Sequence, residues 1–220
     1  FEIERELLGS AALRRGGATV IPVMVSAVNS TEIRGEQLLA RIEDILRETG
    51  ATKVNLIGHS QGALTIRYVA GVRPDLVASV TSVAGPNHGS ELADYLEEHF
   101  PQSTVRGRLV NAAIRLTTLV LAALDTGYRG TRLPTDVDAA HHSLTTSGVA
   151  RFNKLFPQGL PNTWGGQGDE LVNGVRYYSW SGTLQPGRTD RGKNLLDTTN
   201  LTCRIFARTF KKERGQSDGM

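Results

Sequence analysis

A serine between two glycines is the strongest chemical signal in this chain of 220 residues. Gly58-His59-Ser60-Gln61-Gly62 follows a short apolar run at residues 54–57 and precedes a second one at residues 63–70. A strand before the serine and a helix after it are the context in which Gly-x-Ser-x-Gly becomes a nucleophile elbow. We expect Ser60 at the tip of a sharp turn, with Gly58 and Gly62 present because side chains there would collide. The alternative is an ordinary strand–helix turn in which serine is merely small.

A serine nucleophile needs a base that accepts its proton, and the base needs an acid that orients it. The histidines of the chain are His59, His88, His99, His141 and His142. His59 adjoins Ser60, but neighbours across such a turn point to different sides. His88 is the best base candidate within the chain, although we favour a polar loop residue there. His141 and His142 lack the carboxylate or thiol company of a metal site, so we interpret them as surface loop. The sequence offers a nucleophile without a convincing base.

The segments around this motif alternate between helix and strand. Apolar spacing predicts three helices, over residues 1–15, 31–49 and 61–71. Apolar runs predict three strands, over residues 18–25, 53–57 and 76–83. The alternation indicates an α/β fold with a mostly parallel sheet and helices on both faces. Loops at the carboxyl ends of such strands carry the site, and Ser60 and residues 85–90 both fall there.

The second half of the chain is less regular. Residues 105–124 are apolar on more than one face of a predicted helix, so this segment is either deeply buried or needs a partner surface. We interpret residues 128–147 as loop-rich and residues 148–156 as a short helix that Pro157 ends. An Asn-Gly pair at residues 173–174 predicts a late strand or hairpin.

Composition restricts the class of function. The chain carries 25 basic and 22 acidic residues, and its basic residues cluster only at 204–214. Because no nucleic-acid motif or aromatic stacking platform accompanies that cluster, we expect no nucleic-acid partner. Cys203 is the single cysteine, so no intrachain disulfide can form. A hydrophobic content of 39% over this length suits one domain with a sizeable core.

Blocks along nearly the whole chain carry a family resemblance. They are Arg34-Gly-Glu-Gln-Leu-Leu39, Val54-Asn-Leu-Ile-Gly-His-Ser-Gln-Gly62, Arg67-Tyr-Val-Ala70, Arg73-Pro-Asp-Leu-Val-Ala-Ser79, Gly89-Ser90, Ala150-Arg-Phe-Asn153, Phe156-Pro-Gln-Gly159 and Val172-Asn-Gly-Val-Arg-Tyr-Tyr-Ser-Trp-Ser-Gly182. In this order they resemble the secreted bacterial true lipases of the Pseudomonas and Burkholderia type. The resemblance implies an α/β-hydrolase fold that hydrolyses triacylglycerols and related long-chain esters at lipid–water interfaces, through an acyl-enzyme.

The resemblance also implies roles for single residues. Ser60 matches the family nucleophile, and the backbone N–H of Gln61 matches one donor to the oxyanion. Asp218, within Gly215-Gln-Ser-Asp-Gly219, matches the acid of the triad, although a simple Asp-Gly turn is the alternative. We expect His59, beside the nucleophile, to contact substrate.

Further expectations concern a metal ion, a lid and a partner. Asp197 matches the first of two aspartates that hold a structural calcium ion in the family. Calcium takes six or more oxygen ligands, so we expect this site to be incomplete within the chain. Residues 105–124 match the lid helix, in a lid region of about 105–147; an ordinary core helix is the alternative. The family is secreted by bacteria and usually needs a dedicated foldase, so we expect secretion and a foldase partner.

The family extends past both ends of this sequence. We therefore expect residues 1–220 to be one partial α/β-hydrolase domain, without the first family strand and its oxyanion loop and without the catalytic histidine. Hydrolysis by these residues alone should be weak, because the members of a triad act as a unit. An esterase or acyltransferase of the same fold is the nearest alternative. A non-catalytic lipid-binding fragment is an alternative from another class.

Overall fold

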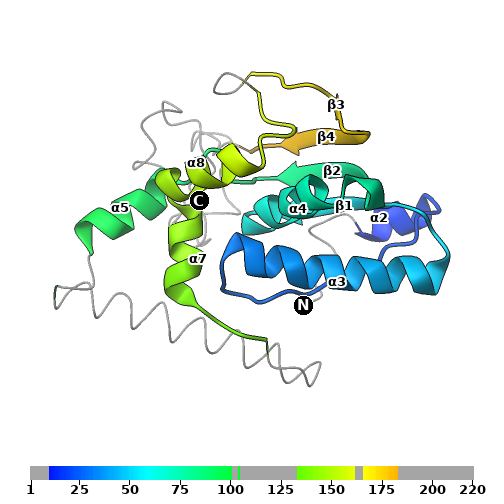
Figure 1. The fold of residues 1–220 in the computed structure, drawn as a ribbon, viewed down its shortest axis with the longest axis horizontal. Helices are drawn as coiled ribbons and strands as arrows, with labels where there is room; N and C mark the ends of the chain where they lie inside the picture. The colour runs from blue at the N-terminus through cyan, green and yellow to red at the C-terminus, as the bar shows by residue number, and fades with distance from the viewer. Residues whose placement is uncertain (1–9, 101–103, 105–132, 162–165, 183–220) are drawn as a thin grey trace, which may run out of the picture.

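The structure, a computed structural model, describes residues 10–100, 104, 133–161 and 166–182 (Figure 1). Its helices in these ranges are α2 (Ser10–Arg15), α3 (Thr31–Thr49), α4 (Gln61–Val72), α5 (Glu91–His99), α7 (Val137–Leu144) and α8 (Thr146–Leu155). A short 3₁₀-helix covers Pro74–Leu76. The strands are β1 (Val54–His59), β2 (Val77–Val83), β3 (Leu171–Val172) and β4 (Val175–Trp180).

These strands form one mostly parallel sheet in the order β1-β2-β4-β3. The β1–β2 and β2–β4 pairs are parallel, and only the short β3 runs antiparallel, against β4. Asn173 and Gly174 connect β3 to β4 with φ of 53° and 77°, the positive values that a tight hairpin turn requires. The predicted α/β class and the late hairpin are therefore confirmed.

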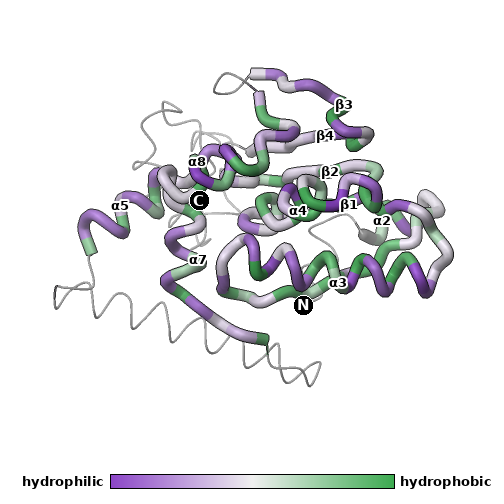
Figure 2. Tube along the Cα trace, in the orientation of Figure 1, coloured by the Kyte–Doolittle hydropathy of each residue, from purple (hydrophilic) through white to green (hydrophobic). Residues whose placement is uncertain are grey.

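Helices α3 and α4 pack side by side, and α4 lies against β1 and β2 (Figure 1). Apolar and polar residues alternate around α3, which gives it one core-facing stripe (Figure 2). Ser30 caps its start by accepting a hydrogen bond from the N–H of Ile33, and Gly50 ends it with φ of 71°. The main core joins α3, α4 and the sheet through Leu38, Ile42, Leu56, Ile66, Val69, Ala70, Val77, Val80 and Val175.

The other face of the sheet is open in the described part of the chain. Along β1, Leu56 and Gly58 are buried, whereas the alternate residues Ile57 and His59 are exposed. On β4, Trp180 is 71% exposed. Alternation of side chains along a strand therefore divides this sheet into a packed face and an open face.

The prediction of a strand at residues 18–25 is wrong, because these residues form no ladder in the structure. Val23 and Val25 pack against the main core, so their apolar character serves packing rather than strand pairing. At the end of this segment, the Ser26 N–H donates to Oε1 of Gln37 at 2.7 Å. A side chain of α3 thus satisfies a backbone donor that a neighbouring strand would otherwise bond.

The structure contains two helices that the sequence did not predict. The segment read as loop-rich contains α7, which Asp136 starts by accepting a hydrogen bond from the N–H of Ala139 at 2.9 Å. His141 and His142 consequently lie on a helix rather than in a loop. Helix α5 was not predicted. The first nine residues and the predicted lid helix at 105–124 lie outside the described residues. Among the described helices, none is long and apolar enough to cross a membrane.

Candidate active site

Ser60 occupies a strained turn between β1 and α4. Its backbone has φ of 53° and ψ of −128°, a region that residues other than glycine seldom adopt. The turn is held in place because the Ser60 N–H donates to the carbonyl of Val83, at the end of β2, at 3.0 Å. The Ser60 side chain makes no capping bond to α4, although serine is a favoured cap, and the residue is exposed. Its hydroxyl is therefore presented to the outside of the turn.

The two glycines of the motif differ in what they do. A Cβ on Gly58 would lie 2.5 Å from the carbonyl carbon of Gly62 and 2.9 Å from the N of Ala63, so only glycine fits there. A Cβ on Gly62 would have no atom within 4 Å. The expected collision is confirmed for Gly58 and wrong for Gly62, because a Cβ on Gly62 would enter open space.

The start of α4 suits a developing negative charge. The first N–H groups of a helix have no partner inside it, and the helix dipole places partial positive charge there. The first turn of α4 contains no acidic residue that would cancel this charge. Gln61, the first residue of the helix, therefore presents its backbone N–H in an environment that favours an anion.

The side chain of Gln61 is held on the inner side of this turn. Its Nε2 donates to the carbonyl of Asn29 at 2.9 Å, and its Oε1 accepts from Nη1 of Arg34 at 2.9 Å. Gln61 is only 9% exposed. With both ends of the amide bonded, the residue that follows Ser60 cannot rotate without breaking two hydrogen bonds.

Arg34 of α3 is the centre of this network. Besides Gln61, it donates to the carbonyl of Ala27 at 3.0 Å and to the hydroxyl of Thr65 at 3.3 Å. Burial lowers the pKa of Arg34 to about 10, so the guanidinium remains charged at neutral pH. The network was not predicted. Arg34 falls within one of the blocks that carry the family resemblance, but no spacing rule connects it to a residue 27 positions later.

The remaining candidates from the sequence are placed only in part. His59 is exposed at the end of β1, in register with Val83 and with Trp180. His88 lies in the loop after β2 and lines a cavity there. Asp218 and Asp197 lie outside the described residues. Their roles as triad acid and calcium ligand therefore stay predictions, as do the roles of Ser60, Gln61 and His59.

Among the described residues, no group of three or more His, Cys, Asp or Glu side chains is placed to hold a metal ion.

Comparisons with known proteins agree with this architecture. A family model described as alpha/beta hydrolase fold matches residues 16–190. A Pseudomonas fragi protein named triacylglycerol lipase is 50% identical over 210 residues, which are 95% of this chain and 70% of that protein. A Vibrio cholerae protein of the same name is 45% identical over 201 residues, which are 91% of this chain and 62% of that protein. The crystal structure of Staphylococcus hyicus lipase matches at a TM-score of 0.52 and 16% identity, covering 88% of this chain and 65% of that one, a likeness of fold alone.

A mostly parallel sheet that holds a serine in a strained strand–helix turn is the arrangement of the α/β-hydrolase class. The family match covers most of the sequence, and the chain belongs to the alpha/beta hydrolase fold family. It is homologous to bacterial proteins named triacylglycerol lipase at 38–50% identity.

Proposed function

We propose that the chain is the nucleophile-bearing part of a triacylglycerol lipase, a serine carboxylester hydrolase that acts on long-chain acyl esters at lipid–water interfaces. The observation that carries this proposal is Ser60, exposed at φ of 53° between β1 and α4. Homology to proteins named triacylglycerol lipase supports ester and lipid substrates. The chain spans 70% and 62% of the lengths of these two relatives, so the activity proposed is that of the protein containing it.

The proposed reaction has two acyl-transfer steps. Ser60 Oγ attacks the ester carbonyl while a histidine removes its proton, and the alcohol leaves with that proton. The backbone N–H of Gln61 donates to the oxyanion, together with a second backbone N–H. Asp218 orients the histidine and stabilises its charged form. Water then attacks the acyl-enzyme and releases the fatty acid, restoring Ser60.

The identity of the histidine that accepts the proton of Ser60 is the least constrained part of the proposal. The family resemblance implies a histidine outside these 220 residues, and His88 is the candidate within them. Replacing His88 with Gln distinguishes the two, because loss of the base lowers kcat by several orders of magnitude. We expect His88→Gln to keep most of the turnover of the wild-type protein.

Further features implied by the resemblance are also proposed. They are a lid formed by residues 105–124, a structural calcium ion at Asp197, secretion, and a foldase partner. Activity that rises sharply above the solubility limit of the ester would support the lid, and loss of activity after chelation would support the calcium ion.

Replacement of Ser60 tests the function directly. In the protein that contains this chain, we expect Ser60→Ala to lower the hydrolysis of emulsified triacylglycerol by roughly 10⁴-fold or more, because the acyl-enzyme cannot form. Ser79→Ala, on β2, is the matched control and should keep wild-type turnover. Unchanged turnover of Ser60→Ala would refute the proposal. An unreactive Ser60 toward a fluorophosphonate probe would instead favour a lipid-binding protein, and hydrolysis of soluble short-chain esters alone would favour an esterase.

A further inference from the structure

Arg67 is a buried cation that lacks a carboxylate partner in the described part of the chain. It lies within α4 and is 4% exposed. Its Nη2 donates to Oδ1 of Asn153 at 3.0 Å and to the carbonyl of Phe156 at 2.9 Å. Its Nε and Nη1 are buried without a hydrogen-bond partner among the described residues. Burial lowers the pKa of Arg67 to about 10, so the guanidinium stays charged at neutral pH. A buried charge without a counter-charge is costly, so this position favours an anion.

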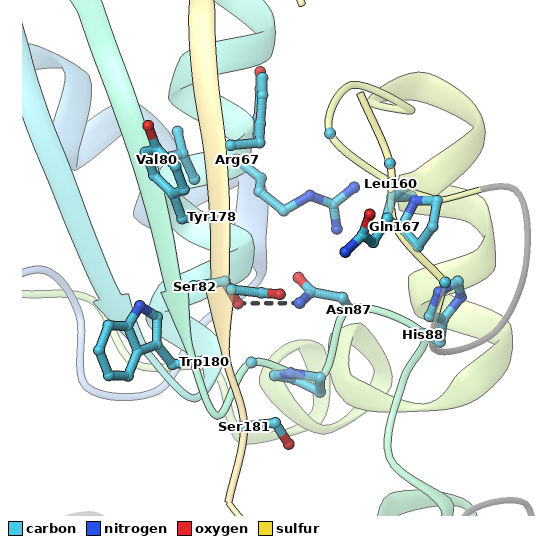
Figure 3. Close-up of a pocket in the computed structure, with 18 of the residues that line it drawn as sticks. Arg67, Val80, Ser82, Asn87, His88, Leu160, Gln167, Tyr178, Trp180 and Ser181 are labelled. Atoms are coloured by element: carbon cyan, nitrogen blue, oxygen red, sulfur yellow. Dashed lines mark hydrogen bonds between the residues drawn. The ribbon is translucent and has the colours of Figure 1, made fainter. Parts of the chain in front are cut away.

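A cavity of about 620 Å³ lies beside this guanidinium. It is formed at the carboxyl ends of β2 and β4 and by the loops at residues 84–89, 159–161 and 166–170. The Arg67 side chain extends from α4 toward Leu160 and Gln167 across this space (Figure 3). The volume lies in the range of small-molecule sites in proteins.

Tyr177 on β4 adds a second donor to the same cavity. Its hydroxyl is buried without a partner among the described residues. Burial raises the pKa of Tyr177, so the phenol keeps its proton and can donate it in a hydrogen bond at neutral pH. A Cβ on Gly159 would overlap the Tyr177 ring, so the ring packs directly against the backbone of Gly159.

The groups that hold Arg67 in place lie behind the residues that line the cavity. Asn153 of α8 accepts from Arg67, and its Nδ2 donates to the carbonyl of Asn87 at 2.8 Å. The Arg67 guanidinium carbon also lies 5.3 Å from the centroid of the Phe152 ring. These contacts fix one side of the guanidinium, while its Nε and Nη1 keep three N–H groups without an acceptor.

The charges and walls of the cavity indicate the class of ligand. Arg67 supplies one buried positive charge. The lining also carries two exposed carboxylates: Glu170 is paired with Arg176 at 2.7 Å, whereas the charge of Asp169 opposes a multiply charged anion such as phosphate. Leu160 and Pro161 offer apolar surface. We propose that this cavity binds the carboxylate of a fatty acid, with Arg67 and Tyr177 as donors and the acyl chain along the apolar wall. The identity of the ligand as a reaction product rests on the proposed lipase function, whereas the carboxylate site itself does not.

Calorimetric titration of the full chain with sodium octanoate tests this site. The Ser60→Ala variant is used throughout, so that binding is measured apart from hydrolysis. We expect octanoate to bind, and Tyr177→Phe and Arg67→Met each to weaken binding roughly tenfold or more, because each removes a hydrogen bond to a charged group. Arg73→Met, at the residue just after the end of the same helix, is the matched control and should bind like the parent. The neutral analogue 1-octanol should bind at least tenfold more weakly, and inorganic phosphate should not compete.

Two results would overturn the carboxylate site. The first is that octanoate fails to bind the parent variant, as expected if a carboxylate of the chain itself neutralises Arg67. The second is that octanoate binds with equal affinity to Tyr177→Phe, a substitution that removes only a hydroxyl and keeps the fold. Neither result bears on turnover by the protein with Ser60 intact. Conversely, unchanged turnover of Ser60→Ala would refute the lipase proposal but would leave octanoate binding at Arg67 in place.

Discussion

Ser60 adopts a backbone conformation that costs an L residue free energy. A non-glycine residue in such a region is destabilised by about 1–3 kcal/mol and persists only where its surroundings impose it. Here the Ser60 N–H donates to the carbonyl of Val83, and the backbone of Gly62 and Ala63 lies against Gly58. The strain places the hydroxyl outside the turn, so stability and the proposed chemistry oppose each other at this residue.

We expect Ser60→Gly to stabilise the protein by about 1 kcal/mol, because glycine adopts the positive φ without strain. The greater entropy of glycine in the unfolded chain offsets only part of this gain. Ser60→Ala keeps the strained backbone and should leave stability nearly unchanged. Both variants should lose ester hydrolysis. Urea unfolding of the three proteins gives the comparison, and a Ser60→Gly variant less stable than Ser60→Ala would show that the turn is not strained.

Gly58 and Gly62 provide a matched pair. We expect Gly58→Ala to destabilise the protein by about 1–3 kcal/mol, because its methyl group meets the backbone of Gly62 and Ala63. Gly62→Ala, whose methyl group meets nothing within 4 Å, should be neutral or stabilising in the helix. Thermal unfolding measures both, and equal melting temperatures for the two variants would contradict this difference.

At the scale of elements, α3 fixes the start of α4 through a single side chain. Arg34 reaches the Gln61 amide, the Thr65 hydroxyl and the carbonyl of Ala27. A lysine at this position offers one point charge and cannot match three acceptors spread around a planar guanidinium. The position of the proposed oxyanion donor therefore depends on a residue that takes no part in the chemistry itself.

We expect Arg34→Lys to lower kcat roughly 10- to 100-fold with little change in KM, because a small displacement of a transition-state donor reduces turnover more than substrate binding. Arg41→Lys is the control on the same helix, where the arginine pairs with Glu48 on the surface at 3.3 Å. Steady-state kinetics on an ester emulsion separates the two constants. A folded Arg34→Lys variant with wild-type kcat would show that Gln61 is held by other contacts.

At the scale of the whole molecule, the loop at residues 27–30 connects parts of the chain that are far apart in sequence. Asn29 is 2% exposed, accepts from Gln61 through its carbonyl, and donates through Nδ2 to the carbonyl of Pro134 at 3.1 Å. Next to it, the N–H of Asp136 donates to the carbonyl of Val28 at 2.9 Å. The start of α7 and the start of α4 are thereby anchored to one loop.

We expect Asn29→Ala to destabilise the protein by about 1–3 kcal/mol, because it leaves buried polar groups without partners. It should also speed hydrogen exchange at the Asp136 N–H, which bonds the same loop. Asn55→Ala, at an exposed amide on β1, is the control and should change neither quantity. Unchanged exchange at Asp136 in Asn29→Ala would mean that the loop and α7 are anchored independently.

Much of the fold follows from local patterns in the sequence. Helical spacing places α3 and α4, apolar runs place β1 and β2, and the Asn-Gly pair places the β3–β4 turn, because each pattern reflects interactions within a few residues. The Gly-x-Ser-x-Gly motif likewise identifies the turn at Ser60. The irregular path of residues 18–25 was not predictable in this way, since a strand also needs a partner on a neighbouring strand.

The sequence by itself determined the class of the fold, the turn and the candidate nucleophile, because strand, turn and helix signals there are all local. Only the tertiary structure decided what surrounds them. The side chain of Gln61 is bonded to Arg34 and Asn29, which lie 27 and 32 positions before it in the sequence. The contact between Arg67 and Asn153 spans 86 positions. The physical reason is that burial and partner choice depend on which distant segments the packed sheet and helices bring together, and no local periodicity encodes that choice.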